Sequence, residues 1–223
     1  SSGFDSGSAI VAPALRYLGV EQVDLLIVSH GDNDHAGGAE GVMASMPVDR
    51  ILAGEALTQV SGFEESCDQG DSWNWDGVEF RILHPLTGST LQGNNSSGVL
   101  LVSSGEFQLL LPGDIGAGIE RQLVRQDWFD DRLEVLVSAH HGSNTSSTLT
   151  FLASVRPQLV IHSAGYRNQF GHPTSRVTGR LEQLGASQLL TASSGMIKVS
   201  LEERGGTYEV RQYREEYRRY WNW

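Results

Sequence analysis

Apolar runs separated by polar turns predict alternating strands and helices along this chain. The amphipathic stretch 9–19 predicts a helix that ends at Gly19, a residue suited to the left-handed helix terminus. The continuous apolar run VDLLIV at 23–28 is typical of a strand covered on both faces. A short helix over 39–46 and a short strand over 50–53 follow in the same pattern.

Strand-like residues on both sides of a glycine turn predict hairpins in three later places. They span 73–83 around Asp76-Gly77, 98–114 around Gly105, and 195–213 around Gly205-Gly206. Between the last two, helical and strand patterns alternate. Helices are predicted over 115–126, 147–155 and 174–184, and strands over 133–139, 158–164 and 187–192. Early hairpins followed by this alternation indicate an α/β fold of layered sheets with helices outside. The charged, aromatic tail 214–223 predicts a solvated extension.

The composition favours a soluble globular protein, because 39% of the 223 residues are hydrophobic and 19% are charged. This length fits one domain, and we expect residues 1–223 to form a single domain. No apolar run approaches the roughly 20 residues of a membrane-spanning helix, and no signal segment is recognisable. The abrupt start at SSGFDSGSAI suggests a fragment of a larger protein. The single cysteine, Cys67, excludes an internal disulfide and a CxxC zinc site.

The charge balance argues against a broad nucleic-acid-binding surface. The formal net charge is −11, and Lys198 is the only lysine among the 16 basic residues. Proteins that hold nucleic acid by its phosphates usually present a basic face. A polyanionic substrate would therefore meet a few arginines and metal ions here.

The strand at 23–28 runs directly into VSHGDNDHAGG, which holds His30, Asp32, Asp34 and His35 within six positions. Imidazole and carboxylate groups together suit zinc, manganese or iron. So dense a cluster in a loop after a buried strand is difficult to explain by structure alone. The sequence therefore predicts a metal site at the end of this strand.

Three later strands also end in polar residues, as ligand sites of layered α/β folds do. The strand before Gly113 leads to Asp114, the strand over 133–139 leads to the pair His140 and His141, and the strand over 158–164 leads to His172. Each has a simpler explanation, because Asp114 could shape a turn, the histidine pair could cap a helix and His172 could order a loop. His84 and His162 are interpreted as structural.

Taken in order, these motifs resemble the metallo-β-lactamase superfamily. The motif His-x-Asp-x-Asp-His at 30–35 is a variant of its His-x-His-x-Asp-His loop, with Asp32 in place of the second histidine. The variant resembles one branch in particular, the carboxy-terminal domain of the ComEC-type channel proteins that carry transforming DNA across bacterial inner membranes. The motifs that carry this likeness are FDSG (4–7), NNSSGVLLV (94–102), LLLPGD (109–114), SAHHGSNTSS (138–147) and SAGYRNQFGHP (163–173).

The resemblance implies a four-layer αββα sandwich that lacks its first hairpin. It also implies two divalent metal ions, with His30 and Asp32 on the first, Asp34, His35 and one of His140 and His141 on the second, and Asp114 bridging. Asn94-Asn95 stands where many relatives have a third histidine. The aspartate at position 32 favours harder ions such as manganese, although zinc also suits this ligand set.

Such a metal pair lowers the pKa of bound water toward neutrality and neutralises charge on a phosphodiester. Two residues are predicted to be catalytic. Asp34 is one, and it is also a metal ligand. His172 is the other, and it is predicted to act as the acid that protonates the leaving oxygen. Predicted phosphate-binding residues are Ser143, Asn144, Ser146, Asn168 and Arg167, with Arg176 near the same loop.

The sequence thus predicts a metal-dependent phosphodiesterase, a nuclease that degrades one DNA strand during uptake of transforming DNA. Its expected partners are single-stranded DNA and the transmembrane channel domain of the same parent protein. By resemblance, the chain is a soluble, extracytoplasmic part of a bacterial inner-membrane protein, with no membrane segment of its own. Two alternatives stay open: hydrolysis of another anionic ester, and a DNA-guiding or docking domain with a vestigial metal site.

Overall fold

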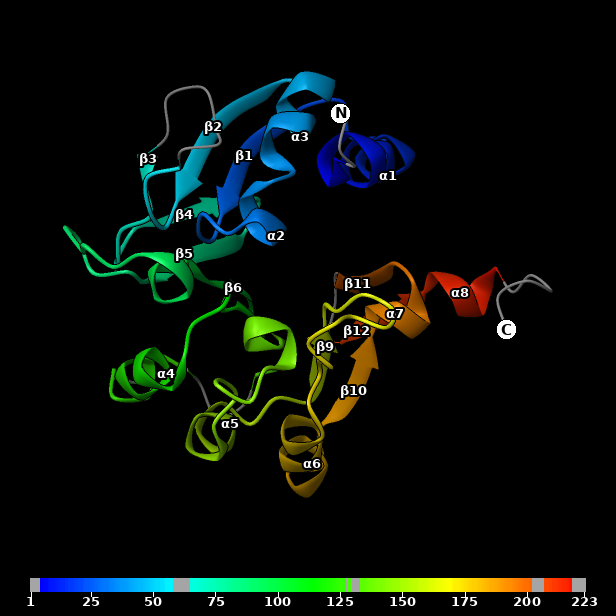
Figure 1. Cartoon of the computed structure of the whole chain (residues 1–223). Coiled ribbons are helices and arrows are strands. Elements are labelled where there is room, and N and C mark those ends of the chain that lie inside the picture. Colours follow the sequence, from blue (N-terminus) through cyan, green and yellow to red (C-terminus); the bar gives the residue numbers. More distant parts are fainter. Residues whose placement is uncertain (1–4, 58–64, 127, 130–132, 202–206, 218–223) are drawn as a thin grey trace. The chain divides into compact units, whose positions relative to one another are not determined.

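The computed structural model of the chain describes residues 5–57, 65–126, 128–129, 133–201 and 207–217 (Figure 1). The chain divides into two compact units. The first unit comprises Ser1–Asp71 and Ile82–Val99, and the second comprises Ser72–Arg81 and Leu100–Trp223. The prediction of a single domain over 1–223 stays a prediction.

The first unit is built on parallel strands with helices packed against them. Its elements are η1 (Gly7–Val11), α1 (Ala12–Tyr17), β1 (Val23–Val28), α2 (Asn33–Ala36), α3 (Ala39–Ser45), β2 (Val48–Ala53), β3 (Glu65–Ser66) and the 3-10 turn η2 (Gly93–Ser96). β1 pairs with β2, and β2 with β3, both in parallel. The predicted strand 23–28 is confirmed at both ends, since the apolar run VDLLIV and β1 coincide.

Apolar side chains from α1 and α3 pack together with residues of the strands. Ala12, Val42 and Met46 are buried there, and Val23 and Val48 of the paired strands contact them. Gly54 lets the end of β2 approach β1 closely, because an added Cβ would lie 2.2 Å from the backbone oxygens of both Ser29 and Ser96. The carboxyl ends of β1 and β2 and the turn η2 are therefore held close to one another.

The second unit contains the larger sheet, with strands in the order β10–β9–β8–β7–β6–β5–β4. The first elements along the chain are β4 (Ser72–Trp75), β5 (Val78–His84), β6 (Val99–Ser104), β7 (Phe107–Leu111), α4 (Ala117–Val124), β8 (Val135–Val137), η3 (Ala139–Gly142) and α5 (Leu149–Val155). They are followed by β9 (Leu159–His162), α6 (Ser175–Gln183), β10 (Ser187–Leu190), α7 (Thr191–Ser194), β11 (Ile197–Leu201), β12 (Tyr208–Gln212) and α8 (Tyr213–Glu216). From β7 to β10 all neighbours are parallel.

Both faces of this parallel part are covered. Phe107, Val135 and Leu159 lie on one face and pack against Val199 and Val210 of the antiparallel hairpin β11–β12. α6 lies on the other face, where the Gln188 amide donates to the Thr178 carbonyl 3.2 Å away. The helices α4 and α5 are also neighbours (Figure 1). Because Leu136 and Val160 are buried as well, the strands are apolar on both sides, as parallel strands usually are.

Most predicted elements are confirmed within a few residues at each end. The predicted strand 187–192 is wrong at its end, because Thr191 begins α7. The Thr191 hydroxyl is held at the backbone of Ala164, whose N–H donates to it at 3.0 Å, so the chain turns there. The predicted turn at Gly205-Gly206 and the tail 218–223 lie outside the described residues. In the part of the chain that the structure describes, no helix is long and apolar enough to cross a membrane.

Two buried histidines support the fold in their neutral form. The Nε2–H of His84 donates to the Asn95 carbonyl at 2.8 Å, and that of His162 donates to the Gln188 side-chain oxygen at 3.1 Å. Burial lowers the pKa of both side chains below the ordinary value. This agrees with the structural role that the sequence assigned to them.

We expect these two histidines to make stability fall as pH drops below about 6.5. Their pKa is lower in the folded state, so the unfolded chain takes up more protons in that range and acid favours unfolding. The contribution is fully present at pH 8. The test is urea unfolding at pH 7.5 and pH 5. The double variant His84→Gln/His162→Gln keeps the hydrogen-bond donors and cannot take up the protons, so its free energy of unfolding should fall less between these pH values than that of the parent. An equal loss in both proteins would contradict this.

Candidate metal centre

The first ligand group follows β1 in the first unit and consists of His30, Asp32, Asp34 and His35. Asp32 is the residue before α2, and its backbone oxygen accepts from the N–H groups of His35 and Ala36 at 2.9 and 2.8 Å. This tight turn brings four potential ligands within one helical turn of the end of a buried strand. His30 is fully buried, whereas the Asp32 side chain is 56% exposed.

The donor atoms of this group have a spacing that suits a metal ion. His30 Nε2 lies 3.4 Å from Asp32 Oδ2, and the His30 and His35 rings are 4.2 Å apart between centroids. Two ligand atoms at about 2.1 Å from one tetrahedral ion are about 3.4 Å apart. The spacing is long for a direct hydrogen bond and correct for two ligands of one ion.

Two serine hydroxyls orient the histidine rings. Ser97 Oγ donates to the Asn94 carbonyl at 2.7 Å, so it accepts from His30 Nδ1, 3.3 Å away. Ser29 Oγ lies 3.2 Å from His30 Nδ1 and 2.9 Å from His35 Nδ1. With Nδ1 of both rings turned to hydroxyls, Nε2 is the atom that each ring presents for a metal.

The Glu55 carboxylate connects the ligand loop to the turn η2. Its Oε1 accepts from the Gly31 N–H at 2.7 Å, and both its oxygens accept from the Gly93 N–H at 3.1–3.2 Å. Glu55 follows Gly54 at the carboxyl end of β2, the parallel neighbour of β1. A single carboxylate thus fixes the backbone beside His30 and the turn that precedes Ser97.

The second ligand group lies in the second unit and consists of Asp114, His140 and His141. These residues follow the carboxyl ends of two neighbouring parallel strands. Asp114 follows β7, and the two histidines follow β8. The His140 N–H donates to the Gly113 carbonyl at 3.0 Å, which ties the two loops together. The predicted convergence of polar residues at strand ends is confirmed for this group.

The distances in the second group also suit ligands of one ion. Nε2 of His141 and Nε2 of His140 lie 3.5 and 3.7 Å from Asp114 Oδ2. His141 Nδ1 donates to the Ser163 carbonyl at 2.8 Å, which leaves the lone pair of this ring on Nε2. His140 Nδ1 faces the Thr145 hydroxyl at 3.2 Å.

The histidine pair has an unusual backbone conformation. His140 and His141 have φ values of 50° and 56°, in the left-handed region that non-glycine residues seldom adopt. Such strain persists where surrounding contacts impose it, and it is concentrated at functional sites.

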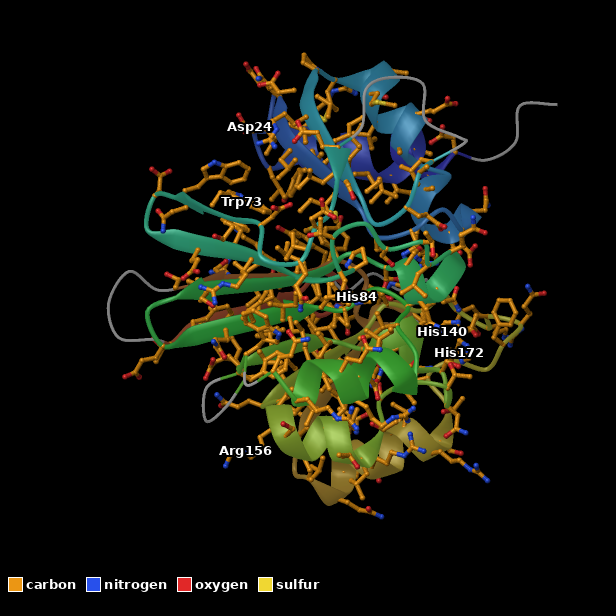
Figure 2. The ribbon with its side chains drawn as sticks, turned by 90° about the vertical axis from the view of Figure 1, so that its left-hand side faces the viewer. Asp24, Trp73, His84, His140, Arg156 and His172 are labelled. Atoms are coloured by element: carbon orange, nitrogen blue, oxygen red, sulfur yellow. The ribbon has the colours of Figure 1, made fainter. Side chains whose placement is uncertain are left out.

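His172 lies beside His140 in the same unit, with ring centroids 5.9 Å apart (Figure 2). Burial lowers the pKa of His172, electrostatic repulsion from the neighbouring His140 and His141 lowers it further, and Asp114 opposes the shift. At neutral pH His172 is therefore mainly a neutral imidazole.

The predicted phosphate-binding residues differ in what they contact. Ser146 is buried, and its hydroxyl donates to the Ile115 carbonyl at 2.7 Å. Asn144 is exposed, and its side-chain oxygen accepts from Arg180 at 3.0 Å. Ser143 is buried, with its hydroxyl 3.0 Å from that of Thr145. Their contact with substrate stays a prediction, and in this conformation Ser146 stabilises its own loop.

The other two predicted residues lie on the loop that follows β9. The Asn168 side chain is bonded on both sides to the backbone of His172, donating to its carbonyl at 2.7 Å and accepting from its N–H at 2.8 Å. Arg167 is exposed and has a φ of 52°. Arg167 is therefore accessible, whereas Asn168 is used to close the loop.

The loop after the histidine pair rests on a buried carboxylate. Glu120 of α4 is fully buried and accepts from the N–H groups of Ser147 and Thr148. Burial raises the pKa of Glu120, while these hydrogen bonds and the nearby Arg180 oppose the shift. Arg180 donates to the Ser147 carbonyl at 3.0 Å. The loop is therefore held by side chains from two helices, α4 and α6.

With the motif loops in place, the comparison with known proteins becomes informative. The family described as "Metallo-beta-lactamase superfamily" matches residues 2–161. The chain belongs to the metallo-β-lactamase superfamily.

Relatives of this superfamily chain include proteins named for competence and for recombination. Competence protein ComA of Neisseria gonorrhoeae is 37% identical over 98% of the chain and 31% of its own length. Recombination protein 2 of Haemophilus influenzae is 34% identical over 89% of the chain and 25% of its length. The chain therefore spans about a quarter to a third of these relatives.

A solved structure agrees with the metallo-β-lactamase fold. A crystal structure from Parabacteroides distasonis, named as a metal-dependent hydrolase, aligns with a TM-score of 0.51 at 13% identity, over 79% of each chain. At this identity the likeness shows the fold alone. The predicted fold class, α/β of the metallo-β-lactamase type, is confirmed.

Sequence reasoning missed the residues around the ligands of this metallo-β-lactamase site. Ser29, Ser97 and Thr145 lie within motifs quoted from the sequence but were given no role there, and Glu55 lies in none of those motifs. One signal was available for Glu55, because it follows the strand beside β1, where polar residues tend to gather. The serine contacts depend on η2 reaching the end of β1, which only the fold shows.

We expect Glu55→Ala to weaken Mn²⁺ binding about 10–100-fold, the usual effect of removing a group that orients ligands. The change leaves two backbone N–H groups without their acceptor and loosens the turn around His30. Glu55→Gln keeps an acceptor oxygen and should retain most of the affinity. Titration calorimetry on metal-stripped protein measures this, with the exposed Glu40→Ala as control. Parent-like affinity of Glu55→Ala would exclude the positioning role.

Proposed function

We propose that this chain is a metal-dependent phosphodiesterase that degrades one strand of DNA during uptake of transforming DNA. Two divalent ions, manganese or zinc, would be held by the residues of the two ligand groups. The proposal rests above all on the equivalent spacing in both groups, where a histidine Nε2 lies 3.4–3.5 Å from an aspartate oxygen. Membership of the metallo-β-lactamase superfamily supports it.

The ligand assignment follows the resemblance to the superfamily motif. His30 and Asp32 would hold the first ion, and Asp34 and His35 would hold the second. Asp114 is buried, with Oδ2 3.5 Å from His141 Nε2 and 3.7 Å from His140 Nε2, and would hold an ion within the second unit. Of the histidine pair, His141 would be the better ligand, because its Nδ1–H is already bound to a backbone carbonyl. When bound, the ions supply a nucleophile from water at neutral pH and offset the charge on the phosphodiester.

The role we assign to His172 is to protonate the leaving oxygen. Alone, its lowered pKa keeps the ring neutral at pH 7. A phosphodiester bound beside it adds negative charge, which favours the imidazolium form and raises the pKa toward the working range. Arg167 and Arg176, both exposed, are available to hold phosphate oxygens.

The biological setting is also a proposal. The relatives are a competence protein and a recombination protein of about three to four times this length. We therefore assign the chain to the extracytoplasmic side of a bacterial inner-membrane protein, with single-stranded DNA as substrate and the transmembrane channel domain of its parent as partner. Two alternative functions must be distinguished from the proposed nuclease. One is hydrolysis of another anionic ester, and the other is a docking role with a vestigial metal site.

We expect Asp34→Ala and His35→Ala to abolish cleavage of an end-labelled single-stranded oligonucleotide and to reduce bound metal. Each removes a metal ligand. His172→Ala should keep its metal and lose about 10²–10⁴-fold in rate, as expected for a removed general acid.

Asp24→Ala is the matched control, since Asp24 is exposed on β1 just before the first ligand group. It should cleave like the parent. If all variants cleave as fast as the parent, the nuclease proposal is wrong. A parent that binds two ions but cuts no DNA would indicate another substrate, and one that retains no transition metal would support the docking role.

Manganese should support cleavage at least as well as zinc, because Asp32 adds an oxygen ligand where the superfamily motif His-x-His-x-Asp-His has a histidine nitrogen. Adding each ion back to metal-stripped protein and measuring initial rates tests this. Activity with zinc alone would contradict the expectation.

A further inference from the structure

The loop 163–174, which joins β9 to α6, presents two strongly exposed aromatic side chains. Tyr166 is 72% exposed and Phe170 is 68% exposed. Burying a large ring normally stabilises a fold, so neither ring contributes much to the packing of its own unit. Their position beside His172 makes them candidates for contact with a ligand.

The loop that carries these rings is well ordered by internal hydrogen bonds. The Asn168 side chain spans the loop, bonded to the backbone N–H and carbonyl of His172. The Gly171 N–H donates to the Asn168 carbonyl at 3.2 Å, and the Asn168 amide also reaches the Gly165 carbonyl at 3.2 Å. The rings are therefore displayed from a fixed backbone, which reduces the entropy lost on binding.

Each ring already makes the kind of contact that a nucleic acid would extend. The Phe170 ring stacks on the His172 ring, with centroids 5.8 Å apart and planes inclined by 22°. The Arg167 guanidinium lies over the Tyr166 ring, 5.1 Å from its centroid. A flat face and a cation thus occur together, next to the residue to which we assign proton transfer.

The surroundings of the rings favour flat, anionic ligands over an apolar protein surface. Arg167, Asn168 and Gln169 separate Tyr166 from Phe170 along the chain, so the rings do not form one continuous apolar patch. Docking surfaces for proteins usually present such a patch. Unpaired bases, in contrast, stack singly on separate aromatic side chains, while arginines contact the backbone.

We propose that Tyr166 and Phe170 form a stacking platform for unpaired bases of the substrate strand, with Arg167 contacting its phosphates. This rests on the proposed nuclease function and adds the residues that hold the bases of its single-stranded substrate. Because every base has a flat face, the platform binds single strands with little sequence preference, and paired bases in a duplex are not available to it.

The experiment compares two strands that share their phosphates and differ in their bases. Fluorescence anisotropy measures binding of a labelled oligo-dT and of an abasic strand of equal length to the whole chain in EDTA, where no metal-dependent cleavage occurs. The parent should bind oligo-dT more tightly. Tyr166→Ala/Phe170→Ala should weaken binding of oligo-dT at least about tenfold and leave the abasic strand nearly unaffected.

Two further variants separate stacking from a general effect on the fold. Tyr166→Trp/Phe170→Tyr keeps both rings and should bind oligo-dT like the parent. Tyr17→Ala removes a ring that is 68% exposed on α1 and should change nothing. Equal thermal stability of all variants confirms that each is folded.

The outcomes distinguish this proposal from the nuclease proposal. A parent that prefers oligo-dT and loses that preference with the rings supports the platform, even if no metal restores cleavage. A parent that cleaves DNA but binds both strands alike, or an unchanged alanine double variant, overturns the platform and leaves the nuclease in place. A parent that binds neither strand also overturns it, and a protein partner then becomes the better explanation of the exposed rings.

Discussion

The parallel hydrogen-bond ladder from β7 to β9 is the constraint on which the second ligand group depends. Leu110 is paired with Leu136, and Val137 with Ile161, so the three strands end at one edge in a fixed register. A slip of one residue would reverse which side chains face the core. The apolar residues on both faces prevent such a slip, and the loops bearing Asp114, His140 and His172 leave the sheet at neighbouring points as a result. The chemistry of this edge is thus a consequence of hydrophobic packing below it.

Around both ligand groups, carboxylates hold backbone N–H groups in loops that lack regular structure. Glu55 does so beside His30, and Glu120 does so beside the loop that follows His141. Glu55 is half-buried, whereas Glu120 is fully buried. Carboxylates that accept from N–H groups form strong, charge-assisted hydrogen bonds. Such loops have few apolar residues to pack, so these bonds replace hydrophobic contacts as the source of rigidity. A metal site needs ligands held to within fractions of an ångström, which explains why the supporting groups are charged.

The sequence was sufficient for most elements and for selecting candidate ligands, and insufficient for the environment of those residues. The apolar residues of the run 23–28 predicted β1, but the strand is less covered than predicted, because Asp24 is exposed and only Val28 of its six residues is buried. The candidate ligands were selected because histidines and aspartates rarely gather after a strand without a function. The left-handed conformation of His140 and His141 has no sequence signal, since it arises from contacts with distant residues. The role of Asn168 was equally hidden, because a side chain that closes a loop and one that binds a phosphate look alike in sequence.

The bonds from Asn168 to the His172 backbone have a consequence for how this protein can change over evolution. The backbone of the loop is determined by Asn168 and its glycines, while the side chains at 166, 167, 169 and 170 point outward and are exposed. Substitutions at those four positions alter the surface offered to a ligand without displacing His172. With the roles proposed here for His172 and the exposed rings, recognition and reaction are separable within a single short segment. Related proteins with the same ligands can acquire new substrates by exchanging a few exposed residues, while the residues around the metal site stay the same.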